Sequence, residues 1–259
     1  MKKLFLMAIL MMAAFVLAAC GEKAALVNSP AEHIEVTEAA DPTQIVMPKE
    51  KTEETEPAET PAPIPVNDPY LALVNFEHPI YEEPPVVLVC DYLTANNVYC
   101  DPRRHANETA VKALNEMLLA AQEEGDFRFI IASAFRYIWE QQMMWEGKLK
   151  EDPTYGSDPY NNPVKLVPTN CSEHTTGLAF DILCDACPHS DVSYANTPEG
   201  RWLAQNAHRF GFILRYPNDK QNITGVQFEP WHFRYVGVAA AEYIYTHSLC
   251  LEEFLGETL

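Results

Sequence analysis

The chain of 259 residues carries 37 acidic and 18 basic side chains, which gives a formal net charge of −19 at pH 7. Net charge of this sign repels phosphate backbones, so we expect no nucleic-acid partner. The acidity otherwise indicates solubility and self-repulsion, and it does not identify a ligand.

Residues 1–20 are typical of a lipoprotein signal peptide. A positively charged start precedes an apolar stretch over residues 4–17, which is short for a membrane span. Small residues then lead to Cys20, a pattern that predicts cleavage before Cys20 and lipidation of its thiol. The alternative is an ordinary signal peptide followed by an incidental cysteine. Lipidation would anchor the chain at the outer face of the bacterial cell membrane.

Residues 21–66 form a different kind of sequence, with seven prolines, many Glu and Thr residues and no aromatic residue. Such a stretch buries too little apolar surface to offset the entropy lost on ordering, so we expect a disordered, acidic, proline-rich stalk. The remaining residues, 67–259, suffice for one compact domain with a single core.

The first elements predicted in this domain are a helix, a strand and a second helix. Apolar residues recur at helical spacing over residues 107–122. Residues 127–133 then predict a strand, and Arg136 would lie just beyond the end of this strand. A helix over residues 137–149 would place Gln141 one turn in, on the side that faces Arg136.

The next predicted strand, over residues 178–183, would project Asp181 from a rigid element, with His174 in the loop before it. A final strand pair would be interrupted at Pro230. This break matters because strict alternation along a strand would point Glu229 and His232 to opposite faces. The other elements expected are a helix over 198–210, a strand over 212–215, the strand pair 226–228 and 232–236, and a helix over 239–249. Helices beside a mainly antiparallel sheet indicate the α+β class.

Two short segments carry the candidate chemistry: one reads Ser-Glu-His-Thr-Thr-Gly-Leu-Ala-Phe-Asp and the other Glu-Pro-Trp-His. They supply His174, Asp181 and His232, a ligand set that suits a catalytic Zn²⁺ with one open position. Asp181 needs such a partner, because an unpaired carboxylate in an apolar strand is costly. Glu229 is then available as a general base towards water.

Four stretches of the chain resemble the VanY-type D-alanyl-D-alanine carboxypeptidases, zinc peptidases that trim peptidoglycan stem peptides. These stretches are 133–141, 172–181, 202–217 and 224–237. The resemblance covers roughly residues 71–255, in family order. It implies one α+β domain with a single Zn²⁺ in a cleft, held by His174, Asp181 and His232, and Glu229 as the catalytic base.

The same resemblance implies that Arg136, Gln141 and Ser172 hold substrate, and Tyr216 is a further candidate for the wall of the cleft. Arg136 would stabilise the developing oxyanion or the terminal carboxylate of the substrate, since its planar fork suits both. The alternative is that Arg136 pairs with a neighbouring acid such as Glu140. The family usually reads Ser-Gly-Tyr-Arg-Ser where this chain has Ser-Ala-Phe-Arg-Tyr, which puts substrate preference in doubt.

We therefore expect a monomeric carboxypeptidase that faces the cell wall and removes the C-terminal D-amino acid, D-Ala, from peptidoglycan stem peptides. An endopeptidase on the same zinc fold is one alternative, because the ends of the cleft depend on loop shape. A non-catalytic wall-binding module is another, and the presence of Glu229 and Arg136 argues against it.

Six further cysteines permit disulfides in an exported chain. We expect Cys90 to pair with Cys100, since they bracket a short turn-like segment. For Cys184 and Cys187, a structural disulfide is favoured over a redox or metal motif. The remaining two are Cys171 and Cys250.

Overall fold

In the computed structural model, residues 68–256 are described, all within the unit Ala40–Leu259. The predicted signal peptide, Cys20 and the predicted stalk lie outside these residues. Within residues 68–256, no helix combines the length and the apolar character needed to cross a membrane.

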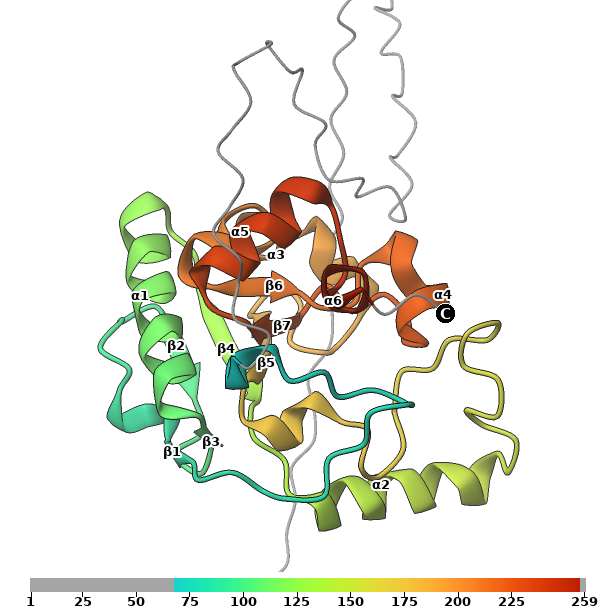
Figure 1. Ribbon diagram of the computed structural model, residues 1–259. Helices are drawn as coiled ribbons and strands as arrows, with labels where there is room; N and C mark the ends of the chain where they lie inside the picture. Colours follow the sequence, from blue (N-terminus) through green and yellow to red (C-terminus); the bar gives the residue numbers. More distant parts are fainter. Residues whose placement is uncertain (1–67, 257–259) are drawn as a thin grey trace, which may run out of the picture. The chain divides into compact units, whose positions relative to one another are not determined.

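A five-stranded mixed sheet forms the centre of the fold, in the order β2-β4-β5-β7-β6 (Figure 1). Its strands are β2 (Val98–Cys100), β4 (Phe129–Ser133), β5 (Ala179–Cys184), β6 (Phe212–Leu214) and β7 (His232–Tyr235). Strands β2 and β4 are parallel, and the other neighbouring pairs are antiparallel. A small second sheet pairs β1 (Val87–Leu88) with β3 (His105–Ala106). The predicted α+β class with a mainly antiparallel sheet is confirmed.

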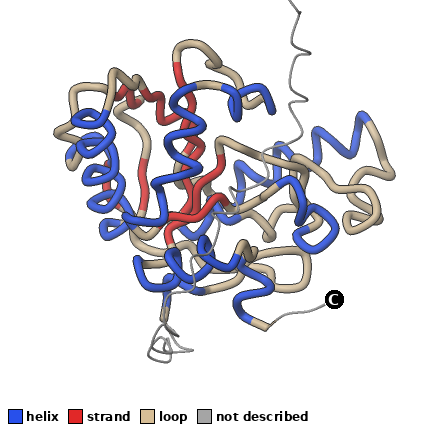
Figure 2. Tube along the Cα trace, turned by 90° about the horizontal axis from the view of Figure 1, so that it is seen from above, coloured by secondary structure: helices blue, strands red, loops and turns tan. Residues whose placement is uncertain are grey.

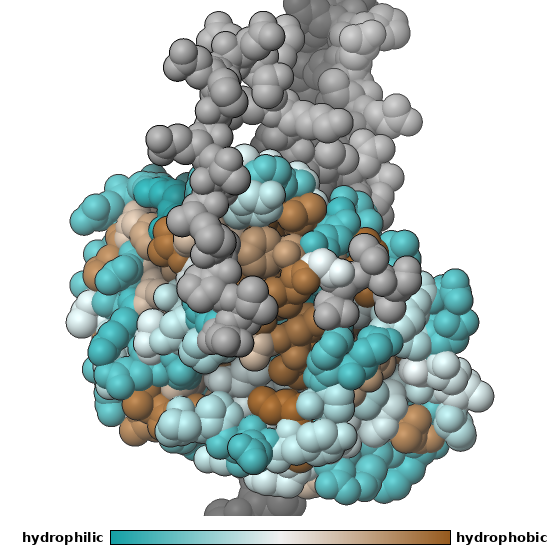
Figure 3. Space-filling model, viewed as in Figure 1, coloured by the Kyte–Doolittle hydropathy of each residue, from teal (hydrophilic) through white to brown (hydrophobic). Residues whose placement is uncertain are grey.

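Helices surround the sheet, as the view from above shows (Figure 2). Helix α1 lies along one flank, whereas α2 lies at the opposite end of the fold from α3 and α5 (Figure 1). The helices are α1 (Glu108–Glu124), α2 (Ile138–Glu151), α3 (Pro198–Asn206), α4 (Gln221–Thr224), α5 (Val238–His247) and α6 (Leu251–Leu255). On the face drawn in Figure 3, an apolar strip crosses the middle and hydrophilic side chains surround it.

The main core lies between α1 and the sheet. Leu114, Met117 and Leu118 of α1 are fully buried in one cluster with Phe129 and Ile131 of β4. Every residue of β5 is buried, so this central strand is a rigid support for any side chain that projects from it. A second apolar cluster joins β6, α5 and α6.

The elements predicted from the sequence are present with two differences, whereas β1, β2, β3, α4 and α6 were not predicted. The helix expected over 198–210 ends at Asn206 and continues as a 3₁₀ turn, Ala207–Phe210. Residues 226–228 do not pair with β7, because their backbone bonds elsewhere. Val226 forms an isolated bridge with Val164, and Gln227 donates its N–H to the Val164 carbonyl at 2.9 Å. Strand β7 instead pairs with β5 and β6.

The disulfide predictions are wrong, because all six cysteines in residues 68–256 are free thiols. The Cys90 sulfur donates to the Cys100 carbonyl oxygen at 3.5 Å rather than bonding to its sulfur. Burial raises the pKa of Cys100 to about 12, which keeps its thiol protonated. Cys184 and Cys187 are bridged through their backbones, with the Cys187 N–H donating to the Cys184 carbonyl at 3.1 Å.

Candidate active site

One hollow of about 580 Å³ opens beside the middle of β5 and the start of β7, and the structure brings the predicted site residues together around it. Its wall includes Arg136, Gln141, Ser172, His174, Asp181, Tyr216, Glu229 and His232. Cys20, the predicted lipidation site, lies outside the described residues.

The three predicted metal ligands converge because two antiparallel strands and one turn meet. Asp181 on β5 stands directly opposite His232 on β7. His174 comes from the 3₁₀ turn Glu173–Thr176, which Gly177 closes at a φ of 72°, a conformation that favours glycine. One ligand atom from each of the three residues lies within 4.8 Å of the others, and all three side chains are buried.

One ring nitrogen of each histidine faces the centre of this cluster, and for His174 a hydrogen bond fixes which one. The Nδ1 of His174 lies 2.7 Å from the Ala134 carbonyl oxygen and donates to it, which leaves Nε2 free to face Asp181 at 3.4 Å. The Nδ1 of His232 faces Asp181 at 3.2 Å. Oδ1 of Asp181 is buried without a hydrogen-bond partner among the described residues.

The cluster is small enough to close around Zn²⁺. Ligand atoms held about 2.0–2.2 Å from a tetrahedral Zn²⁺ lie about 3.3–3.6 Å apart. Nε2 of His174 lies 3.4 Å from Oδ2 of Asp181, Nδ1 of His232 lies 3.2 Å from Oδ1 of Asp181, and one ligand atom from each residue lies within 4.8 Å of the others, so a small approach of the side chains would complete the site. Oδ1 of Asp181 is buried, has no hydrogen-bond partner in residues 68–256 and faces the His232 ring at 3.2 Å, so a bound cation would balance its negative charge. The donor set, two imidazoles and one carboxylate, therefore suits this metal.

Glu229 lies beside the cluster without belonging to it. One of its carboxylate oxygens is 3.6 Å from Nδ1 of His232, and the side chain lines the hollow although it is buried. The turn at Pro230 brings this about, because the His232 N–H donates to the Glu229 carbonyl at 3.0 Å. Burial raises the pKa of Glu229 to about 8. A cation in the cluster would favour its ionised form, as a proton acceptor requires.

Arg136 is held by polar neighbours rather than by an acid. Its Nη1 donates to Oε1 of Gln141 at 2.8 Å, and its Nη2 donates to the Ser133 hydroxyl at 3.3 Å. Glu140, the alternative partner, instead accepts the backbone N–H of Tyr137 at 3.0 Å. The local ion pair is therefore not formed, and the guanidinium lines the hollow.

The side-chain amide oxygen and nitrogen of Gln141 are both hydrogen-bonded within the protein. Its oxygen accepts from Arg136, and its Nε2 donates to the Val167 carbonyl at 2.6 Å. These bonds indicate that Gln141 acts through Arg136, although the resemblance assigns it to substrate binding. Ser172 and Tyr216 line the hollow directly, and the Tyr216 ring also packs on His232 with centroids 4.9 Å apart.

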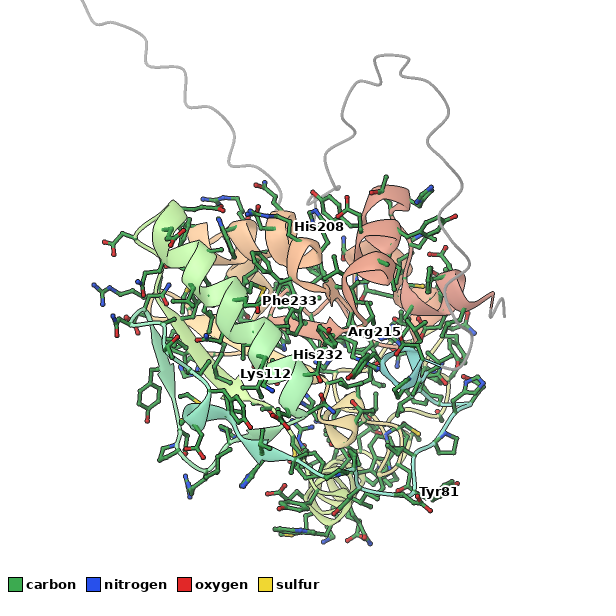
Figure 4. The ribbon with its side chains drawn as sticks, turned by 60° about the vertical axis from the view of Figure 1, so that its left-hand side comes forward. Tyr81, Lys112, His208, Arg215, His232 and Phe233 are labelled. Carbon is green, nitrogen blue, oxygen red and sulfur yellow. The ribbon has the colours of Figure 1, made fainter. Side chains whose placement is uncertain are left out.

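A buried acid, Glu173, was not predicted as a site residue. Its Oε1 accepts from Nε of Arg215 at 2.7 Å and from Nη1 of Arg234 at 2.8 Å. Its Oε2 faces Nε2 of His232 at 3.8 Å, and neither of these two buried atoms has a hydrogen-bond partner in residues 68–256. His232 and Arg215 both lie in the interior of the fold (Figure 4). Although burial alone would raise the pKa of Glu173, the two guanidinium groups hold it below its usual range.

This arrangement makes Glu173 a positioning residue for His232. A metal-binding histidine generally presents its second N–H to a carboxylate, which fixes the ring and its tautomer. The signal in the sequence was indirect: Arg234 lies in β7 and Arg215 directly follows the apolar strand β6, where a guanidinium needs a buried acid. Glu252 of α6 completes the network by accepting from Nη1 and Nη2 of Arg215 at 2.8 and 2.6 Å.

We expect Glu173→Gln to lower zinc affinity by about 10- to 100-fold, because the carboxylate that orients His232 is lost. The change should also destabilise the fold by about 3–5 kcal/mol, since it breaks a buried ion pair. Zinc affinity is measured by competition with a chromophoric chelator, and stability by denaturant unfolding.

The matched control is Glu252→Gln, which removes the other acid of this network but does not alter the group facing His232. It should lower stability and leave zinc affinity near that of the unmodified chain. Equal zinc affinities in the two variants would contradict the positioning role of Glu173.

Comparison with known proteins agrees with this site. The sequence model of the VanY family, described as D-alanyl-D-alanine carboxypeptidase, matches residues 103–238, which is more than half of the chain. A D-alanyl-D-alanine carboxypeptidase of Enterococcus faecalis is 41% identical over 146 residues, covering 55% of this chain and 52% of the relative. The chain therefore spans about half the length of that relative.

Solved structures share the fold. The LdcB LD-carboxypeptidase superposes with a TM-score of 0.64 at 30% identity, covering 74% of this chain and 89% of that chain. A mutant of the vancomycin-resistance D,D-pentapeptidase VanY in complex with Zn(II) superposes with a TM-score of 0.56 at 34% identity, covering 73% and 99%. With its fold, its cluster of histidine and aspartate side chains and its sequence in agreement, the chain belongs to the VanY family of D-alanyl-D-alanine carboxypeptidases.

Proposed function

We propose that the protein is a zinc-dependent carboxypeptidase that removes the C-terminal D-amino acid, D-Ala, from peptidoglycan stem peptides. The observation that carries this is the convergence of His174, Asp181 and His232 beside Glu229 in one hollow. The name of the Enterococcus faecalis relative and the Zn(II) in the VanY structure support it. A non-catalytic binding module would need neither Glu229 beside the cluster nor a held guanidinium at Arg136.

The residues of the hollow divide the work of peptide hydrolysis. Zn²⁺ held by His174, Asp181 and His232 would supply Lewis acidity, which lowers the pKa of a water to about 7 and polarises a carbonyl. Glu229 takes the proton of the attacking water and later returns it to the amine of the departing residue, so one carboxyl group serves both steps. Arg136, fixed by Gln141 at 2.8 Å, donates to the oxygen on which negative charge develops.

A carboxypeptidase also needs a group that binds the free carboxylate of the last residue. Besides Arg136, the wall offers the Ser172 hydroxyl and the ammonium group of Lys165, which sequence reasoning missed. The Lys165 Nζ donates to the Ser190 carbonyl at 2.5 Å and lies 4.7 Å from the centroid of the Trp231 ring, so the wall holds it in place. Cationic and hydroxyl donors at this wall favour a terminal carboxylate over the continuing chain that an endopeptidase would bind.

We further propose that a lipid on Cys20 anchors the protein at the outer face of the bacterial cell membrane, from which residues 21–66 extend a monomeric catalytic domain to the cell wall. The lipobox and the proline-rich composition of the stalk support this proposal. Cells grown with a labelled fatty acid should label the intact chain and not Cys20→Ser. Equal labelling of the two would contradict lipidation at this cysteine.

The metal assignment predicts one zinc per domain. A strong chelator should abolish hydrolysis, and added Zn²⁺ should restore it. Replacing His174, Asp181 or His232 by Ala should remove the metal, because two remaining ligands hold Zn²⁺ poorly. Elemental analysis of each purified variant measures this, and full zinc occupancy in any of the three would remove that residue from the site.

A further inference from the structure

A second hollow of about 580 Å³ adjoins the first, and no role has been assigned to it. The two hollows share Arg136, Met144, Asp181 and Ser190 in their walls. The second hollow extends from the metal cluster towards the segment between β2 and β3, which contributes Asp101, Arg103 and Arg104, and towards His105 of β3. It is therefore a continuation of the cleft rather than a separate cavity.

Arg104, in the wall of this second hollow, has a cationic side chain with a polar atom that is not hydrogen-bonded. Its Nε is buried and has no hydrogen-bond partner within residues 68–256. Among the described residues, its guanidinium makes no ion pair either. The adjacent Arg103 provides a contrast, because it donates to both carboxylate oxygens of Asp101, from Nε at 3.0 Å and from Nη2 at 2.7 Å.

The acids around the second hollow are already engaged. Asp101 accepts from Arg103, and Glu140 accepts the backbone N–H of Tyr137 at 3.0 Å. Asp181 belongs to the metal cluster. A half-buried guanidinium that has no acid of its own is costly unless a ligand supplies the partner. A carboxylate matches its planar fork of donors.

The donors that line each hollow indicate which end of the bound peptide lies in it. A carboxypeptidase accommodates only one residue beyond the scissile bond, and the donors suited to its carboxylate, Ser172 and Lys165, line the first hollow alone. The rest of the peptide must leave the metal cluster by another route. The second hollow offers that route past Arg136 and Asp181.

We propose that Arg104 binds a carboxylate on the part of the stem peptide that precedes the scissile bond, so that the second hollow selects acidic peptides. The proposal rests on the carboxypeptidase function proposed above. It assigns Arg104 to substrate selection, distinct from the role of Arg136 at the reacting carbonyl.

The test compares two peptides that share one D-amino-acid end and differ only upstream, where one has free carboxylates and the other has carboxamides. With the zinc-loaded protein, Arg104→Gln should lower kcat/KM for the carboxylate peptide by about 10- to 100-fold, as expected for the loss of a charged hydrogen bond. The carboxamide peptide should be cleaved nearly as before. Arg104→Lys should recover part of the loss, because it keeps the charge without the fork.

Arg103→Gln is the matched control, since it removes a neighbouring arginine that already has a partner, and it should leave both peptides unaffected. An equal loss for the two peptides in Arg104→Gln would mean a structural role and would overturn the proposal, as would no loss for either. Calorimetric binding of both peptides to Glu229→Gln makes the same comparison without turnover. A binding difference that depends on Arg104, with no cleavage by the unmodified protein, would refute the proposed function alone.

Discussion

Glu229→Gln should retain zinc and the native fold and lose hydrolysis by about 10²- to 10⁴-fold, because an amide cannot accept the proton of the attacking water. The substitution preserves the size and shape of the side chain, so the hollow should not collapse. Steady-state kinetics with a short peptide ending in a D-amino acid, together with elemental analysis of the same sample, measures both effects.

Zinc content separates this result from a loss of the metal site. Glu229 stands 3.6 Å from His232 but is not one of the three clustered ligand residues, so its replacement should leave occupancy near one. A variant with normal zinc and near-native turnover would show that the base lies elsewhere.

Arg136→Ala should lower kcat by about 10²- to 10³-fold, the usual cost of removing one oriented donor to a developing oxyanion. Arg136→Lys should recover only part of this loss, since lysine keeps the charge without the planar pair of donors. Gln141→Ala should cause a smaller loss, because it frees the guanidinium that its oxygen holds at 2.8 Å.

Glu140→Gln serves as the control for this series. Glu140 bonds to the backbone of Tyr137 and does not pair with Arg136, so its replacement should leave kcat unchanged. Near-native turnover by Arg136→Ala would contradict a role of Arg136 at the reacting carbonyl and would indicate that the side chain has only a structural role.

The sequence could predict the centre of the candidate site because its geometry is local. His174 and Asp181 lie seven residues apart, on a turn and the strand that follows it, and Glu229 and His232 flank a single proline. Strand pairing then needs only to set Asp181 opposite His232. An apolar strand that contains one carboxylate already indicates that the carboxylate has a partner.

Features that depend on long-range packing could not be predicted in the same way. Glu173 meets Arg215 and Arg234, which lie 42 and 61 residues further along the chain. Their pairing depends on where β6 and β7 enter the sheet. The amide of Gln141 was likewise unpredictable, because its second partner is the carbonyl of Val167, in a loop with no regular pattern.

The failed predictions have physical causes of the same kind. Residues 226–228 alternate as a strand does, yet their backbone bonds to Val164 and leaves β7 to other partners. Cysteine spacing indicated that Cys90 could reach Cys100, and the two do lie close together. Spacing could not reveal that the Cys90 sulfur points to a carbonyl oxygen instead.

Identifying the residue released from peptidoglycan stem peptides tests the central claim most directly. The zinc-loaded protein is incubated with pentapeptide and tetrapeptide stems, and the products are separated and identified by mass spectrometry and chiral analysis. We predict release of one free D-amino acid, D-Ala, from the C-terminus of at least one of them, and none after chelation or with Glu229→Gln. Release of internal fragments, or no release from either stem by protein of full zinc content, would contradict a carboxypeptidase.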